Sequence, residues 1–109
     1  MNPSFNGGFF VCCIFIVMIN DITLFLKRRF NQKEFDKCIV SSMFEWIDDT
    51  TNYREFEINV INDSVVNYFW DNYEYDFFDQ TDLDDAKQFE SFVTKKYEQK
   101  LRDFYNRSK

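Results

Sequence analysis

The sequence of 109 residues contains no histidine, one proline and two glycines. Histidine is the side chain most often used as a general base and as a metal ligand, so its absence removes the commonest catalytic machinery. The two glycines, Gly7 and Gly8, are adjacent, whereas a phosphate-binding loop of the usual kind needs glycines at wider spacing. We therefore expect that the protein is not an enzyme and that it uses no cofactor and no metal.

Cysteine is also scarce, with three residues that cannot form a closed set of disulfides. Cys12, Cys13 and Cys38 lack the spacing of a zinc site as well. Reduced thiols are the simplest interpretation, and they predict a cytoplasmic protein.

The residues that are abundant are apolar and aromatic. Apolar residues make up 45% of the chain and aromatic residues 21%, including 15 phenylalanines. A chain of this length supports one domain with one modest core, and the shortage of turn-forming residues favours helices. We therefore expect an all-α fold in which residues 18–109 form a single helical domain.

Apolar residues at helical spacing predict four helices, over residues 21–30, 32–48, 63–73 and from about residue 82 toward the C-terminus. Asn31 followed by Glu34 is typical of a helix start, and Thr81 or Asp82 can cap the last helix. The connections between these helices are short, which favours an antiparallel four-helix bundle.

One segment allows a second interpretation. Phe56, Ile58 and Val60 alternate with polar residues, which is typical of a strand. A small α+β domain with a short hairpin near residues 55–60 is therefore the alternative fold. In both interpretations Asp63 or Ser64 would cap the helix that follows.

The N-terminal stretch FFVCCIFIVMI, residues 9–19, is wholly apolar. A membrane-spanning helix needs ~20 such residues, and an extension to Leu26 would have to include Asn20 and Asp21. Three interpretations stay open for residues 1–17. They are a dispensable, non-native extension in front of a natural start at Met18, part of a membrane anchor, or an extra core helix.

Residues 69–86, FWDNYEYDFFDQTDLDDA, alternate aromatic rings with carboxylates. No lysine or arginine occurs from Glu55 to Ala86, so these carboxylates repel one another. Asp82, Asp84 and Asp85 are explained by the start of the last helix, where carboxylates are favourable.

The other carboxylates of this stretch, Asp71, Glu74, Asp76 and Asp79, fall at a helix C-terminus and in the loop after it. Anions do not stabilise a helix C-terminus, so local stability does not explain them. A solvated turn is one interpretation, and a surface that meets a basic partner is the other. The net charge of −6 excludes general nucleic-acid binding and suits such a partner. We expect Phe69, Trp70, Tyr73 and Phe77 to belong mostly to the core.

Two parts of the chain resemble a known family. MINDITLFLKRRFNQKEFDKCI, residues 18–39, is similar to the opening of the colicin D-type immunity proteins, in a short helix with Leu24-Phe25-Leu26 followed by Glu34-Phe35. Residues 65–101 follow the same order of amphipathic helix, acidic loop and acid-capped final helix. The chain departs from this pattern in residues 1–17, in residues 50–61 and at Tyr75, where the family often has a proline.

The resemblance implies a small cytoplasmic helical bundle that binds the nuclease domain of a colicin or contact-dependent toxin. In such a family the acidic loop stands where tRNA phosphates would lie in the toxin's basic cleft. Asp71, Glu74 and Asp76 correspond to the loop carboxylates, and charge alone adds Asp79. We expect Tyr73 and Tyr75 to serve as aromatic anchors of the same partner-binding site. The protein would then be a monomer that forms a heterodimer with the toxin and binds no nucleic acid directly.

Two other functions remain open. A phage-type DNA mimic that inhibits a defence nuclease would also be acidic, although basic residues over 27–37 and 87–109 speak against a long acidic face. A small membrane-anchored protein would use residues 9–26 as its anchor.

Overall fold

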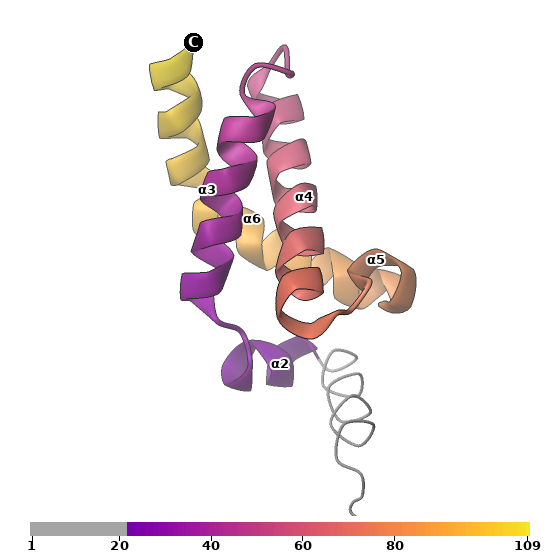
Figure 1. Ribbon diagram of the computed structural model, residues 1–109. Coiled ribbons are helices and arrows are strands. Elements are labelled where there is room, and N and C mark those ends of the chain that lie inside the picture. Colours follow the sequence, from indigo (N-terminus) through magenta and orange to yellow (C-terminus); the bar gives the residue numbers. More distant parts are fainter. Residues whose placement is uncertain (1–21) are drawn as a thin grey trace, which may run out of the picture.

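The computed structural model describes residues 22–109, all of whose regular structure is helical (Figure 1). The expectations for residues 1–17, for a start at Met18 and for Cys12 and Cys13 lie outside the described residues. The helices are α2 (Ile22–Arg28), α3 (Gln32–Trp46), α4 (Tyr53–Tyr73), α5 (Phe77–Gln80) and α6 (Leu83–Ser108). The all-α prediction is thus confirmed for this part of the chain.

Three long helices, α3, α4 and α6, pack together and alternate in direction. The end of α4 meets the start of α6, where the rings of Phe69 and Phe89 have centroids 5.3 Å apart. The start of α4 meets the end of α6 at Phe56 and Tyr105, with ring centroids 5.4 Å apart. The short α2 lies across one end of this group, close to the last turn of α4 (Figure 1).

Helix α4 begins ten residues before the predicted start and overturns the hairpin alternative. Asn52 accepts a hydrogen bond from the Glu55 N–H at 2.8 Å and so caps the helix. Phe56 and Val60 are buried at a spacing of four, whereas Ile58 between them is 45% exposed. The two buried residues therefore lie on the inner face of a helix, Ile58 lies outside it, and the alternation does not mark a strand.

Asp63 and Ser64 lie inside α4 and cap nothing, which corrects the predicted helix start. The Ser64 hydroxyl donates to the Cys38 carbonyl at 3.3 Å, and Asp63 accepts from the Ser42 hydroxyl at 2.8 Å. Both side chains therefore join α4 to α3.

The other predicted helix starts are only partly right. Asn31 caps α3 by accepting from the Glu34 N–H at 3.2 Å, as expected. Asp82 occupies the cap position of α6, but its side chain makes no capping hydrogen bond. The one-turn α5 was not expected, because four residues show no periodicity that separates them from a loop.

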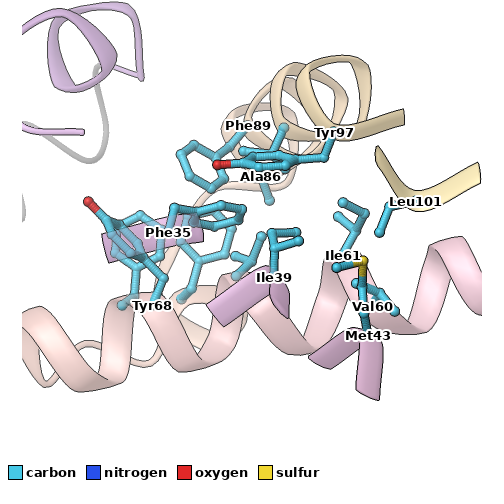
Figure 2. Close-up of a cluster of buried hydrophobic side chains, with 14 of the residues drawn as sticks. Phe35, Ile39, Met43, Val60, Ile61, Tyr68, Ala86, Phe89, Tyr97 and Leu101 are labelled. Carbon is cyan, nitrogen blue, oxygen red and sulfur yellow. The ribbon is translucent and has the colours of Figure 1, made fainter. Parts of the chain in front are cut away.

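The core is built mainly from aromatic rings (Figure 2). Phe35 of α3 lies between Tyr68 of α4 and Tyr97 of α6, with ring centroids 5.3 and 5.5 Å away. Toward the other end, Ile39 and Met43 of α3 and Leu101 of α6 continue the same buried cluster, together with Val60 and Ile61 of α4 (Figure 2). Each such ring removes a large apolar area from water, so replacing one with alanine is expected to cost ~3–5 kcal/mol.

Two tyrosines of α4 hold the connection between α2 and α3. The Tyr68 hydroxyl accepts from the Asn31 N–H at 2.9 Å, and the Tyr73 hydroxyl donates to the Arg29 carbonyl at 3.2 Å. Burial raises the pKa of Tyr68 further above the ordinary tyrosine value. The last two turns of α4 and the backbone before α3 are therefore one fixed unit.

Within residues 22–109, no helix combines the length and the apolar character needed to cross a membrane.

Candidate partner-binding site

The acidic stretch surrounds the junction between α4 and α5 (Figure 1). Helix α4 ends at Tyr73, and Glu74 then adopts the left-handed conformation with φ 53° and ψ 39°. That conformation turns the chain sharply, so α5 folds back beside the last turns of α4 (Figure 1). Left-handed backbone is unfavourable for a residue with a Cβ atom, by about 1–2 kcal/mol.

Buried aromatic rings fix this turn from beneath. Phe77 is fully buried and stacks on Phe69, with ring centroids 4.6 Å apart. Tyr75 is 4% exposed, and its hydroxyl donates to the Gln80 carbonyl at 2.9 Å and lies 3.0 Å from the Thr81 hydroxyl. The acidic turn is therefore mounted on a packed aromatic base.

The predicted site residues fall into two groups. Asp71, Glu74, Asp76 and Asp79 are all exposed, whereas Tyr75 is buried and Tyr73 is half-buried. The expectation that Tyr75 anchors a partner is therefore wrong for this conformation, because its ring fills the core under the turn. Tyr73 keeps an exposed part, although its hydroxyl is engaged by the backbone of Arg29.

The four exposed carboxylates form no ion pair within residues 22–109. A hydrogen bond to Asp76, and then the negative charge of Asp76, raise the pKa of Asp79. These groups repel one another, and none of them is paired with a cation in the described part of the chain. The approach of a cationic surface would lower the electrostatic free energy of such an arrangement.

The acidic residues of the chain are concentrated in the segment that contains this turn. Residues 55–86 hold ten of the nineteen aspartates and glutamates and none of the thirteen lysines and arginines. Among residues 22–109, no group of three or more potential ligand side chains is arranged to hold a metal ion.

Sequence reasoning missed an exposed apolar surface beside the acidic turn. Trp70 was expected in the core but is 57% exposed, and Val66 and Phe78 are each 39% exposed. Trp70 follows Val66 by four residues and therefore lies on the same side of α4. The signal was present in the sequence, since Tyr68 and Phe69 already supply the two inward positions of that turn.

A shallow groove of about 320 Å³ adjoins this surface. Its lining comes from α3, α4 and α5, and consists of Trp46, Asn59, Asn62, Asp63, Val66 and Phe78.

A second groove, of about 450 Å³, lies between α4 and α6. Its charged lining mixes both signs, with Arg54 and Lys95 beside Glu57, Glu90 and Glu98. Burial raises the pKa of Glu90. The mixture gives this groove no preference for a ligand of one charge.

Comparison of the chain with models of protein families, with curated proteins and with solved structures finds no match.

Proposed function

We propose that this protein is an immunity protein that binds a bacterial toxin nuclease and blocks its active site. The observation that carries the proposal is the exposed cluster of Asp71, Glu74, Asp76 and Asp79, which projects from a rigid aromatic base. A nuclease cleft is basic because it binds phosphates, and these carboxylates would take the place of the phosphates. Inhibition would then need no chemistry by this chain.

The fold suits this role. A packed base under the acidic turn holds the carboxylates in place before binding, which lowers the entropy lost in the complex. The resemblance to colicin D-type immunity proteins supports the same interpretation, with α2, α3, α4 and α6 as the four helices of the expected bundle. On this proposal the toxin is a colicin D-like tRNA nuclease or a contact-dependent toxin, and the protein acts in the cytoplasm as a monomer paired with it.

The proposal is tested with the gene next to the one that encodes this chain. Its C-terminal domain is expressed alone and together with the full-length protein, and cell growth and tRNA integrity are measured. We expect killing by the domain alone and rescue by this protein. A neighbour that is harmless and does not bind would overturn the proposal.

Charge reversal then locates the inhibitory surface. Asp71→Lys, Glu74→Lys and Asp76→Lys should each weaken binding to the toxin domain by about 2–5 kcal/mol, or roughly 30- to 5,000-fold. Asp49→Lys is the matched control, because Asp49 is exposed in the connection at the other end of α4. Equal affinity of all four variants would remove the acidic turn from the proposal.

The salt dependence separates electrostatic attraction from loss of folding. The three reversals should slow association, and the difference from the unaltered protein should shrink as salt is added, because ions screen exposed charges. Circular dichroism of the free variants should remain that of the unaltered protein.

A DNA mimic directed at a defence nuclease is the second candidate. The same carboxylates favour this function. Their position at one end of the helices does not, because a DNA mimic needs a long acidic face. If the neighbouring gene product is harmless, inhibition of purified restriction nucleases would test this candidate directly.

A further inference from the structure

The apolar face of this protein, formed by Trp46, Val66, Trp70 and Phe78, is exposed enough to require an explanation. Trp70 is more than half exposed, and Val66 and Phe78 are each more than a third exposed. Large apolar side chains that cluster on a surface mark an interaction site more often than chance. Tryptophan is also the residue most enriched among the side chains that dominate binding energy.

A hollow is already present in this face. Trp46, Val66 and Phe78 line the groove of about 320 Å³, and they come from three different helices. An apolar side chain of a partner could enter this groove without displacing any of these elements. Trp70 lies one turn of α4 beyond Val66 and extends the same face toward the acidic turn.

The charged groups on α4 beside the apolar face are acidic, and the other polar residues of the groove, Asn59 and Asn62, are neutral. Asp63 lines the groove, and both of its hydrogen bonds, from Ser42 and Asn67, go to the same oxygen, Oδ2. This leaves Oδ1 for a donor from outside. Asp71 follows Trp70 directly and is exposed. Residues 55–86, which supply the α4 and α5 parts of this face, contain no lysine or arginine, so the charge that these two helices present to a partner on this face is negative.

We infer that the apolar face binds an amphipathic, basic helix of the toxin partner. One apolar side chain of that helix enters the groove between Trp46 and Phe78, and neighbouring lysines or arginines pair with Asp63 and Asp71. Helices that bind in grooves present their apolar anchors at spacings of three and four residues, so one such anchor would enter the groove while the next packs against Trp70. The inference rests on the proposed function, and it adds the apolar contact that charge mimicry alone does not provide.

The two tryptophans make the inference directly measurable. The chain has only two, and both belong to the apolar face, so the emission of selectively excited tryptophan reports on this face, whereas the six tyrosines do not contribute to it. The full-length protein is titrated with a synthetic helical peptide of leucine and lysine that contains no tryptophan. We expect a saturable blue shift of the emission, because the peptide removes Trp70 from water. A peptide of the same composition in scrambled order should bind at least about 10-fold more weakly, a difference of about 1.4 kcal/mol.

A matched pair of variants separates apolar docking from simple charge attraction. Val66→Glu and Val40→Glu each add one negative charge at a helical valine, and the two valines are 39% and 38% exposed. Val40 lies on α3 and points away from Ser42, which faces the groove side of α4. Val66→Glu should weaken peptide binding at least about 10-fold, whereas Val40→Glu should leave it unchanged or slightly tighter.

Three results would overturn the inference. They are absence of a fluorescence change, equal binding of the scrambled peptide, and equal affinity of the two glutamate variants. Sedimentation of the full-length protein adds a fourth, since a dimer that Val66→Glu converts to a monomer would mean that a second copy covers the face.

If charge reversals in the acidic turn abolish rescue from the toxin and Val66→Glu does not, the inference fails and the proposed function stands. If the neighbouring gene encodes no toxin, the function fails, and the peptide titration still decides whether the face binds basic helices.

Discussion

Asp76 and Asp79 lie one helical turn apart at α5, and their interaction raises the pKa of Asp79. The protonated carboxyl of Asp79 donates to Asp76, and the negative charge of Asp76 further disfavours ionisation. The folded protein therefore holds this proton more tightly than the unfolded chain does. The contribution of this proton to stability is therefore present below the ordinary aspartate pKa, ~3.9, and is lost as the pH rises through the raised value of Asp79.

The interaction predicts a measurable change in the titration of Asp79. Asp76→Asn removes the neighbouring charge, so the midpoint of the Asp79 carboxyl resonance should move to lower pH in an NMR titration. Asp71→Asn is the control, because Asp71 lies on α4 and is not a cause of the Asp79 shift. A midpoint of Asp79 that is the same in Asp76→Asn as in the unaltered protein would contradict the assignment.

Replacing Glu74 with glycine should stabilise the protein and, on the proposed function, weaken its binding to the partner. Its left-handed conformation is unfavourable for glutamate and free of penalty for glycine. Glu74→Gly should therefore stabilise the protein by about 1 kcal/mol in urea unfolding and weaken binding of the toxin partner. Glu74→Gln keeps the side chain without its charge and should weaken binding with little change in stability. A destabilised Glu74→Gly variant would show that the side chain itself supports the turn.

Tyr75 is predicted to act through folding alone. Tyr75→Phe loses the hydrogen bond to the Gln80 carbonyl and should cost about 0.5–1.5 kcal/mol of stability. Tyr75→Ala empties the space under the turn and should cost ~3–5 kcal/mol. Under conditions where Tyr75→Phe is fully folded, its affinity for the partner should equal that of the unaltered protein. A loss of affinity in the folded Phe variant would restore Tyr75 as a contact residue.

Cys38 is predicted to be unreactive in the folded protein. Burial, followed by the charges of Asp71, Glu34 and Asp63, raises its pKa to about 11. At pH 8 the thiolate fraction is then on the order of 100-fold below that of an ordinary cysteine. Alkylation of the peptide containing Cys38, followed by mass spectrometry, should be slower by that factor in buffer than in urea. Equal rates in the two conditions would contradict the burial of this thiol.

Much of the fold was predictable, because a narrow stripe of apolar residues at helical spacing identifies a helix. Helix α6 shows this, because Phe89, Val93 and Tyr97 repeat at a spacing of four. Helix α4 was harder to recognise, because it has α3 on one side and α6 on the other and therefore a broad apolar surface. Asn52 followed by Glu55 was the signal that would have placed its start, because Glu55 also accepts from the Thr51 N–H at 2.8 Å.

The charge of the site was predictable from the sequence, but the burial of its aromatic side chains was not. Exposed carboxylates such as Asp71 and Glu74 follow from the cost of burying an unpaired charge. The burial of Tyr75 depends on how the chain turns at Glu74, and no local pattern encodes that turn. The groove beside Val66 was beyond sequence reasoning as well, because its lining comes from three helices.

The hydroxyls of Tyr68 and Tyr73 form hydrogen bonds with the backbone before α3. Through these bonds, hydrogen exchange at the Asn31 amide should depend on the stability of the acidic turn. A partner that binds the end of α4 stabilises these last turns, and stabilisation by binding is transmitted to whatever they hold in place. If a partner binds the acidic turn as proposed, hydrogen exchange at Asn31, whose N–H donates to the Tyr68 hydroxyl at 2.9 Å, should therefore slow. The α2 helix and the acidic end would then open and close as one cooperative unit.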